Sequence, residues 1–294
     1  MKILILVLSS DTYPSKRNKR AIKETWAKNR QEGVRIIFYS AGSDNKLIGN
    51  ELTVKSGLNT SDIGYKTIKA FEWCKENLEF DFIFRTNTSS YIDIENLVNY
   101  INLLQSAEEY IYHGLIASLP KNENREKIDF VSGAGILFNK NVIELLVKNK
   151  DNINFDEWDD VALALFLKKY NIYPTEGKRF DIKGNIFKLK IDKSFYHFRC
   201  RIDNYYNYPR FLEYYVIHEL HNKLKDIETR NFVKALYSFM FEISKILYIQ
   251  QPFWKLYGVF KKVIKLFLPK KIFKFLKNFF EKNDESIKLR YLKK

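Results

Sequence analysis

The segment Lys2–Ser9, KILILVLS, is the stretch from which the fold can be inferred. It is short and almost wholly apolar and it leads into polar residues, a pattern typical of a strand buried on both faces of a parallel sheet. A helix over about residues 15–29 is expected next, with Ser15 as its N-cap. Val34–Tyr39 then predicts a second strand. The chain therefore opens as a strand–helix–strand unit.

The same alternation continues along the chain. Further strands are expected at Phe80–Phe84, Tyr110–Ser118 and Phe130–Phe138, and helices over about 62–78, 93–105, 141–147 and from about 156. Alternating strands and helices predict an α/β fold whose ligand crevice lies at the carboxyl ends of the strands. We expect one domain over residues 1–227 and a helical extension over residues 228–294.

The positive charge is concentrated in that extension. Of a net charge of +15, residues 228–294 contribute +11, from sixteen Lys and Arg against five Asp and Glu. Aromatic and aliphatic residues recur there at three- and four-residue steps, as in Phe253, Tyr257 and Phe260, with lysines between them. Basic amphipathic helices of this kind suit an anionic membrane surface. Packing on the domain or oligomerisation is the alternative, and no nucleic-acid partner is expected because the tail has no recognised RNA- or DNA-binding pattern.

The remaining composition narrows the class of protein. Two cysteines, Cys74 and Cys200, exclude a disulfide framework, and no apolar run has the length of a membrane span. The opening apolar run is too short for a signal peptide. We therefore expect a cytoplasmic protein that is attached peripherally to a membrane.

Four local patterns are candidates for chemistry. They are Arg17–Trp26 (RNKRAIKETW), Arg85–Asp93 (RTNTSSYID), Val131–Leu137 (VSGAGIL) and Asp156–Val161 (DEWDDV). The first two place basic and small polar residues where strands end, a place suited to phosphate and ribose. The glycines of the third suggest close backbone approach to a ligand, or a bulge. The clustered acids of the fourth either complement a helix dipole or form a poised base.

Each pattern also has an ordinary structural explanation. The first would be an amphipathic helix with a charged outer face, and the second a polar turn with Asp93 as a helix cap. His197 adds a further candidate, because it lies beside Arg199 and Arg201 in a strand-like segment rich in phosphate-binding groups. His218 and His221 are expected to be surface or core residues.

In order along the chain, these patterns resemble the β-1,3-galactosyltransferase family, glycosyltransferase family 31, with its Fringe-like relatives. The matching segments are Arg20–Trp26, Lys66-Thr67-Ile68 with Trp73, Arg85–Ser89 at the position of the family's acidic triplet, Ser132–Gly135, and Asp159-Asp160-Val161. The resemblance covers about residues 1–200. It implies a GT-A type, Rossmann-like domain that binds a nucleotide-sugar, and an inverting transfer of a hexose from a UDP-sugar.

The resemblance also implies roles for individual residues. Asp160 would be the catalytic base, with Asp159 as its neighbour. The donor-binding set would be Ser9, Arg17, Arg20, Lys66, Arg85, Asn87, Ser89, Ser132, Gly133, Gly135, His197 and Arg199. The hexose would be of the galactose or N-acetylglucosamine type, and the acceptor would be a hydroxyl of a glycan or a lipid-linked glycan.

Two departures from the family pattern matter. The acidic triplet, which binds a divalent ion in the family, is here Asn87-Thr88-Ser89. If Mn²⁺ or Mg²⁺ binds, the candidate ligands are Asn87, Ser89 and His197, which are poor for a hard cation. Otherwise Arg85, Arg199 or Arg201 would neutralise the diphosphate, or catalysis would be lost. The second departure is the absence of the amino-terminal anchor of the animal enzymes, which the basic tail would replace.

Three functions stay open on the sequence. We expect an active glycosyltransferase at a membrane surface. The alternatives are a catalytically silent protein that binds a sugar-nucleotide or glycan, and a basic adaptor at the membrane surface.

Overall fold

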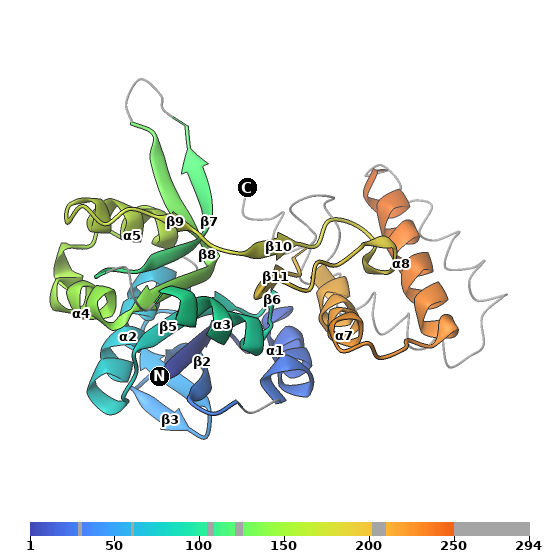
Figure 1. Cartoon of the computed structure of the whole chain (residues 1–294), viewed down its shortest axis with the longest axis horizontal. Coiled ribbons are helices and arrows are strands. Elements are labelled where there is room, and N and C mark those ends of the chain that lie inside the picture. The colour runs from blue at the N-terminus through green and yellow to red at the C-terminus, as the bar shows by residue number, and fades with distance from the viewer. Residues whose placement is uncertain (29–30, 60–61, 105–108, 121–125, 202–209, 250–294) are drawn as a thin grey trace. The chain divides into compact units, whose positions relative to one another are not determined.

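The computed structural model describes residues 1–249 except 29–30, 60–61, 105–108, 121–125 and 202–209 (Figure 1). The chain divides into a compact unit over Met1–Phe241 and a second unit over Glu242–Lys294. The expected amphipathic face from Phe253 onward lies outside the described residues. Within the described residues, none of the helices combines the length and apolar character needed to span a bilayer.

The central strand of the compact unit is β1 (Ile3–Leu8). It pairs in parallel with β2 (Val34–Gly42) on one side and with β5 (Phe82–Asn87) on the other. Residues Ile3–Val7 are all 3% exposed or less, so the expectation of a doubly buried parallel strand is confirmed. The carboxyl ends of these three strands consequently meet at one edge of the sheet.

The main sheet is mixed. Its eight described strands run in the order β3-β4-β2-β1-β5-β8-β7-β9, with β8 antiparallel to both β5 and β7. The strands not yet given are β3 (Lys46–Ile48), β4 (Glu51–Lys55), β7 (Tyr112–Leu119), β8 (Ile128–Asn139) and β9 (Thr175–Glu176). The expected α/β class is therefore confirmed. β3 and β4 lie between the predicted strand at Val34–Tyr39 and the predicted helix over 62–78, where no strand is expected from the sequence.

Three helices share one core cluster with the sheet: α2 (Ile63–Asn77), α4 (Lys140–Lys148) and α5 (Asp159–Lys168) (Figure 1). Their apolar residues pack against alternate residues of β1, β2 and β4, as the two-residue period of a strand requires. Removing this apolar surface from water provides the main driving force for folding. Because α5 packs on β8, its amino end is held near the carboxyl end of β5.

The helix after β1 differs from the expectation at both ends. α1 (Ser15–Glu24) begins at Ser15 itself, and no side chain caps its first turn. Pro14 takes the N-cap position in place of Ser15, and the Ser15 hydroxyl accepts a hydrogen bond from the Ser10 N–H at 2.8 Å within the preceding loop. After Glu24 the chain turns through η1 (Trp26–Lys28), so the helix stops short of residue 29. The helix packs against α7 (Glu213–Leu224).

A small second sheet begins directly after β5. It has the order β10-β11-β6, with β6 (Ser90–Ile92), β10 (Arg179–Asp181) and β11 (His197–Arg199). Antiparallel pairing of β11 with β6 places Arg199 opposite Ser90. A segment more than a hundred residues later in the chain is thereby brought beside the end of β5.

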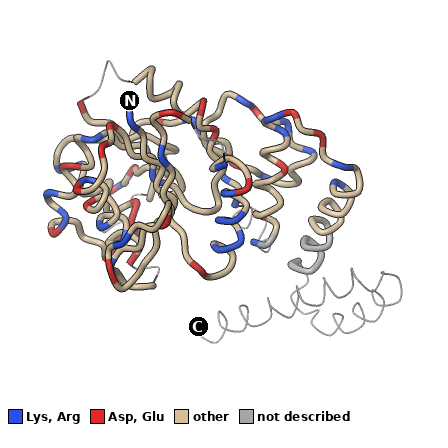
Figure 2. Tube along the Cα trace, turned by 90° about the horizontal axis from the view of Figure 1, so that it is seen from below, with Lys and Arg blue, Asp and Glu red and all other residues tan. Residues whose placement is uncertain are grey.

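The remaining described elements belong to the compact unit, except that α8 continues past the unit's last residue, Phe241. They are α3 (Ile94–Leu104), η3 (Lys150–Asn152), η4 (Ile186–Lys188), η5 (Arg210–Leu212) and α8 (Asn231–Ile249). Tyr237 of α8 packs edge-on against Phe187, with ring centroids 5.2 Å apart, so the unit extends beyond residue 227. Lys and Arg alternate with Asp and Glu over this unit (Figure 2), in keeping with the small net charge of residues 1–227.

Candidate functional site

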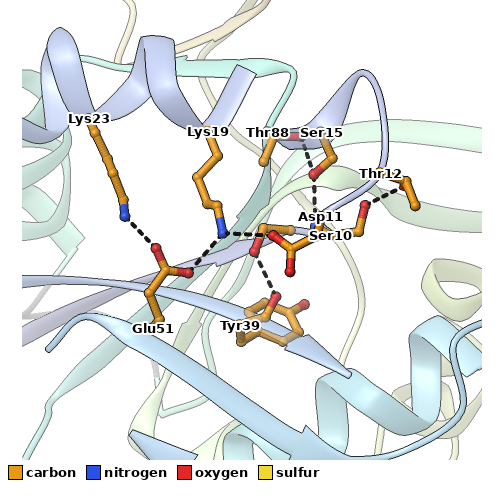
Figure 3. Close-up of polar contacts among 10 residues, drawn as sticks. Ser10, Asp11, Thr12, Ser15, Lys19, Lys23, Tyr39, Glu51 and Thr88 are labelled. Carbon is orange, nitrogen blue, oxygen red and sulfur yellow. Dashed lines mark hydrogen bonds and ion pairs between the residues drawn. The ribbon is translucent and has the colours of Figure 1, made fainter. Parts of the chain in front are cut away.

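The loop after β1 forms one wall of the candidate site (Figure 3). The Ser9 hydroxyl donates to the Tyr39 carbonyl at 3.3 Å, which ties the loop to β2. The hydroxyls of Ser15 and Thr88 lie 3.2 Å apart, so the same loop also contacts the segment after β5. Short hydroxyl side chains therefore line the point where β1 and β5 end.

The basic residues of α1 are mostly engaged with acidic neighbours (Figure 3). Lys19 pairs with Glu51 at 2.9 Å, and Lys23 pairs with the same carboxylate. Arg20 is exposed and pairs with Glu24 at 2.7 Å, so the structure does not bring it to the other predicted donor-binding residues. Much of the positive charge of α1 is therefore neutralised by ion pairs within the protein.

Arg17 has a different environment. Its guanidinium lies over the rings of Tyr214 and Tyr215, 4.8 and 5.1 Å from their centroids, so it is held by aromatic contact with α7. Lys66 of α2 is buried, and burial lowers the pKa of its ammonium, although Asp62 acts in the opposite direction. Within the described part of the chain, neither Arg17 nor Lys66 has a carboxylate at salt-bridge distance.

Arg85, near the carboxyl end of β5, hydrogen bonds to residues of several other elements. Its side chain is 3% exposed, and one terminal nitrogen donates to Asp159 at 2.7 Å. The other terminal nitrogen donates to the Gly133 carbonyl, and Nε donates to the Tyr39 hydroxyl at 3.2 Å. The Tyr39 hydroxyl in turn contacts Thr67 of α2 at 2.9 Å. Arg85 thus fixes the start of α5 against three other elements, and its charge is balanced by a carboxylate.

Asp160 follows Asp159, which pairs with Arg85, but the carboxylate of Asp160 has a different hydrogen-bond donor. One carboxylate oxygen accepts from the Gly133 N–H at 2.9 Å. Burial raises the pKa of Asp160, the nearby Asp159 raises it further, and the Gly133 N–H and Arg85 act against this rise. A carboxylate with a raised proton affinity is suited to accept a proton.

The glycine segment of β8 explains how these groups approach so closely. The β7–β8 register shifts between Gly114 and Ile116, so residues 132–135 bulge out of the ladder. A Cβ at Gly133 would lie 2.8 Å from Arg85, and one at Gly135 would collide with the His197 ring. The expected bulge is therefore confirmed, and the glycines make room for the side chains of Arg85 and His197. Close approach of this backbone to a ligand stays a prediction. Ser132 lies in the same bulge and is half-buried.

The segment Asn87–Ser89 is held by arginines and one glutamate. Asn87 Oδ1 accepts from Arg199 at 2.9 Å. The Ser89 hydroxyl donates to Glu213 at 2.8 Å and accepts from Arg210 at 2.7 Å. Arg210 also pairs with the fully buried Glu213 at 2.6 Å. Asn87 and Ser89 thus each contact a guanidinium group, whereas Thr88 between them contacts the Ser15 hydroxyl.

The three candidate ligands for a divalent cation do not fit one. The only ligating oxygen of Asn87 already faces Arg199, and the Ser89 hydroxyl is shared between Arg210 and Glu213. His197 is 1% exposed, its Nε2 contacts the Ser90 hydroxyl at 3.0 Å, and it does not converge with the other two. No set of three or more His, Cys, Asp or Glu suited to a metal occurs among the described residues. We assign no metal-dependent step to this site.

Four important residues were not predicted from the sequence: Tyr39, Asn18, Arg210 and Glu213. Asn18 is 1% exposed and donates to Glu213. Arg210 and Glu213 lie three residues apart at the start of α7, a spacing that allows an ion pair. That spacing is common on helix surfaces, however, and nothing local distinguishes this pair from a surface pair.

Comparisons with known proteins give distant similarities. No family model matches the chain. It is 22% identical over 209 residues to β-1,3-galactosyltransferase 1 of Mus musculus and of Homo sapiens, covering 60% of this chain. The chain spans 64% of the length of those relatives.

Two solved glycosyltransferase structures are distantly similar to this chain. The galactosyltransferase LgtC, in complex with donor and acceptor sugar analogs, is 10% identical with a TM-score of 0.41 over 80% of this chain and 99% of that one. A glycosyltransferase involved in glycosylation of the major capsid of PBCV-1 is 10% identical with a TM-score of 0.41, over 62% of this chain and 85% of that one.

Proposed function

We propose that this protein is a glycosyltransferase that transfers a hexose from a UDP-sugar to a hydroxyl of a glycan or glycolipid, with inversion at the anomeric carbon. The observation that carries the proposal is Asp160, a half-buried carboxylate with a raised pKa beside the Asp159–Arg85 pair. The similarity to β-1,3-galactosyltransferase 1 supports the same class of reaction.

In this proposal Asp160 is the catalytic base. The acceptor hydroxyl oxygen forms a bond to the anomeric carbon of the sugar while the bond from that carbon to the diphosphate breaks. The proton of the hydroxyl passes to Asp160, and the bonding electrons leave with UDP. Arg85 and the Gly133 N–H hold the two carboxylates in place, so that the base is oriented before the acceptor arrives.

The neighbouring surface suggests where the acceptor would lie. Trp158 immediately precedes the two carboxylates, and its side chain is 68% exposed. An exposed indole offers an apolar face with a polar edge, on which a sugar ring can stack. We place the acceptor on Trp158 and the nucleotide towards the Ser9–Ser15 loop, where Ser9, Arg85 and Lys66 would contribute to donor binding.

The experiment is a transfer assay with a panel of UDP-sugars and sugar acceptors. Asp160→Asn should abolish transfer while UDP binding and the melting temperature are retained. Asp156→Asn is the matched control, because Asp156 is exposed and belongs to the same acidic run. Unchanged transfer by the Asp160 variant would remove Asp160 from the mechanism. UDP-sugar binding without turnover by the unmodified protein would favour the catalytically silent alternative.

We further propose that the protein associates with an anionic membrane surface through α8 and the basic tail. The exposed residues at the start of α8 support this: Phe232 and Phe239 are 69% and 57% exposed, on the same helix whose Tyr237 and Phe241 are buried. The chain then continues into the lysine- and aromatic-rich residues 250–294. Apolar insertion and lysine attraction would act together.

Vesicle sedimentation tests this second proposal. The full chain should bind vesicles containing phosphatidylserine, and binding should weaken when Phe232 and Phe239 are both replaced by serine. Leu103→Ser is the control, since Leu103 is 79% exposed on α3. Equal binding to vesicles of neutral lipid, or no effect of the double replacement, would contradict the proposal.

A further inference from the structure

Arg199 is a largely buried cation whose partner is a neutral side chain. Its guanidinium donates to Asn87 Oδ1 at 2.9 Å and, within the described residues, contacts no carboxylate. Burial lowers its pKa to about 10, and the positive charges of Arg201 and Arg179 contribute, while Glu213 acts in the opposite direction. A buried charge is costly unless an opposite charge balances it.

The nearby acids are already used by other arginines. Glu213 receives hydrogen bonds from Arg210, from Ser89 and from Asn18, which occupy both carboxylate oxygens. Asp181 is bound by Arg179 through two hydrogen bonds, at 2.7 and 3.2 Å. Neither acid is therefore available to balance Arg199. Among Arg179, Arg199 and Arg210, Arg199 is the one for which the described residues provide no hydrogen bond to a carboxylate.

We infer that Arg199, supported by Arg210, forms an anion-binding site for the diphosphate of the donor at the position where related enzymes hold a divalent cation. The inference rests on the proposed function, because it concerns the leaving group of that reaction. The placement is favourable: Asn87 is the last residue of β5, Ser89 follows two residues later, and Arg85 of the same strand donates to Asp159 of the carboxylate pair. A guanidinium binds phosphate oxygens through two parallel hydrogen bonds, so it can supply both charge and orientation.

The same contacts disfavour a cation at this place. A divalent ion at Asn87 would have to displace Arg199 from Oδ1 or lie against its positive charge. A cation at Ser89 would meet Arg210 in the same way. We therefore expect binding of the nucleoside diphosphate to depend on arginine and to be independent of Mn²⁺ and Mg²⁺.

The first test uses the unmodified full chain and UDP as the probe. Isothermal titration calorimetry in EDTA, in Mn²⁺ and in Mg²⁺ should give the same dissociation constant. If UDP binds only when a divalent cation is present, the inference is overturned and the proposed function still stands. If neither UDP nor any UDP-sugar binds under any of these conditions, the proposed function fails and the inference fails with it.

The second test changes the charge itself. Arg199→Gln should weaken UDP binding by more than about tenfold, because a charge-assisted contact is lost, and Arg199→Lys should weaken it less. Arg35→Gln is the control, since Arg35 is exposed at the amino end of β2, at the opposite edge of the sheet. Circular dichroism checks that each variant is folded. If Arg199→Gln does not fold, Arg199→Lys still tests the contact, because lysine retains the buried positive charge. Unchanged UDP affinity in both folded Arg199 variants would overturn the inference.

Discussion

Asp159 and Asp160 are adjacent in the chain, yet we expect their replacement by asparagine to change stability in opposite directions. Asp159 pairs at 2.7 Å with Arg85, whose side chain is 3% exposed. Asparagine at that position can still accept a hydrogen bond from Arg85, but it removes the negative charge that balances the buried guanidinium, whose other partners, the Tyr39 hydroxyl and the Gly133 carbonyl, are neutral. Removing one partner of a buried pair is strongly destabilising because the other charge stays in the protein without compensation.

The size of the effect follows from the burial of the pair. Asp159 is 20% exposed, so water compensates part of the loss. We therefore expect Asp159→Asn to lower the free energy of unfolding by about 3 kcal/mol, the lower end of the range for buried pairs. In a unit of this size that corresponds to a fall in the melting temperature of about 6–12 °C.

Asp160→Asn should behave differently because folding raises the pKa of Asp160. The folded state keeps this proton at pH values where the unfolded chain has released it, so the contribution of Asp160 to stability falls as the pH rises through that window. An amide carries no charge and can still accept from the Gly133 N–H. The variant should therefore be as stable as the unmodified protein or more so at about pH 7, and its advantage should shrink towards about pH 4.

The assay is thermal unfolding by circular dichroism at both pH values, with Asp156→Asn as the exposed control. Two results would refute the reasoning. One is a loss of stability in Asp160→Asn as large as that in Asp159→Asn. The other is an unchanged melting temperature in Asp159→Asn, which would mean that the Arg85 pair contributes little.

The other predictions concern neighbouring groups. Tyr39→Phe should cost about 1–2 kcal/mol in urea unfolding, because Arg85 and Thr67 lose a shared hydroxyl partner; an unchanged midpoint would argue against that network. Gly135→Ala should cost about 1–3 kcal/mol, since its Cβ would collide with the buried His197 ring; a thermal melt that matches the unmodified protein would show that the ring can move. Trp158→Ala should raise KM for the acceptor without changing Tm, and an unchanged KM would exclude stacking at this exposed side chain.

Much of the local structure could be predicted because it depends on neighbours in the sequence. The apolar run of β1 and the helical spacing of Ile63, Thr67, Phe71 and Cys74 predict which faces are buried, and of those helix residues all but the half-buried Ile63 are buried. The acidic pair ahead of α5 also stood out, because two carboxylates at a helix start exceed what a cap requires. The two-residue strand β9 and the three-residue strands β3, β10 and β11 are too short to show a reliable period, and they form only because a longer strand or one another pairs with them.

By itself, the sequence determined an α/β fold and a basic, aromatic tail and drew attention to Asp160, since each depends on residue type and local spacing. Only the tertiary structure decided the charge balance of the site. Glu213 lies 124 residues from Ser89 and yet receives its hydrogen bond, and Arg199 lies 112 residues from Asn87. Electrostatic energy depends on distance in space. Which arginines pair with an acid within the protein, and which one hydrogen bonds to a neutral side chain, therefore follows from how the chain folds back on itself.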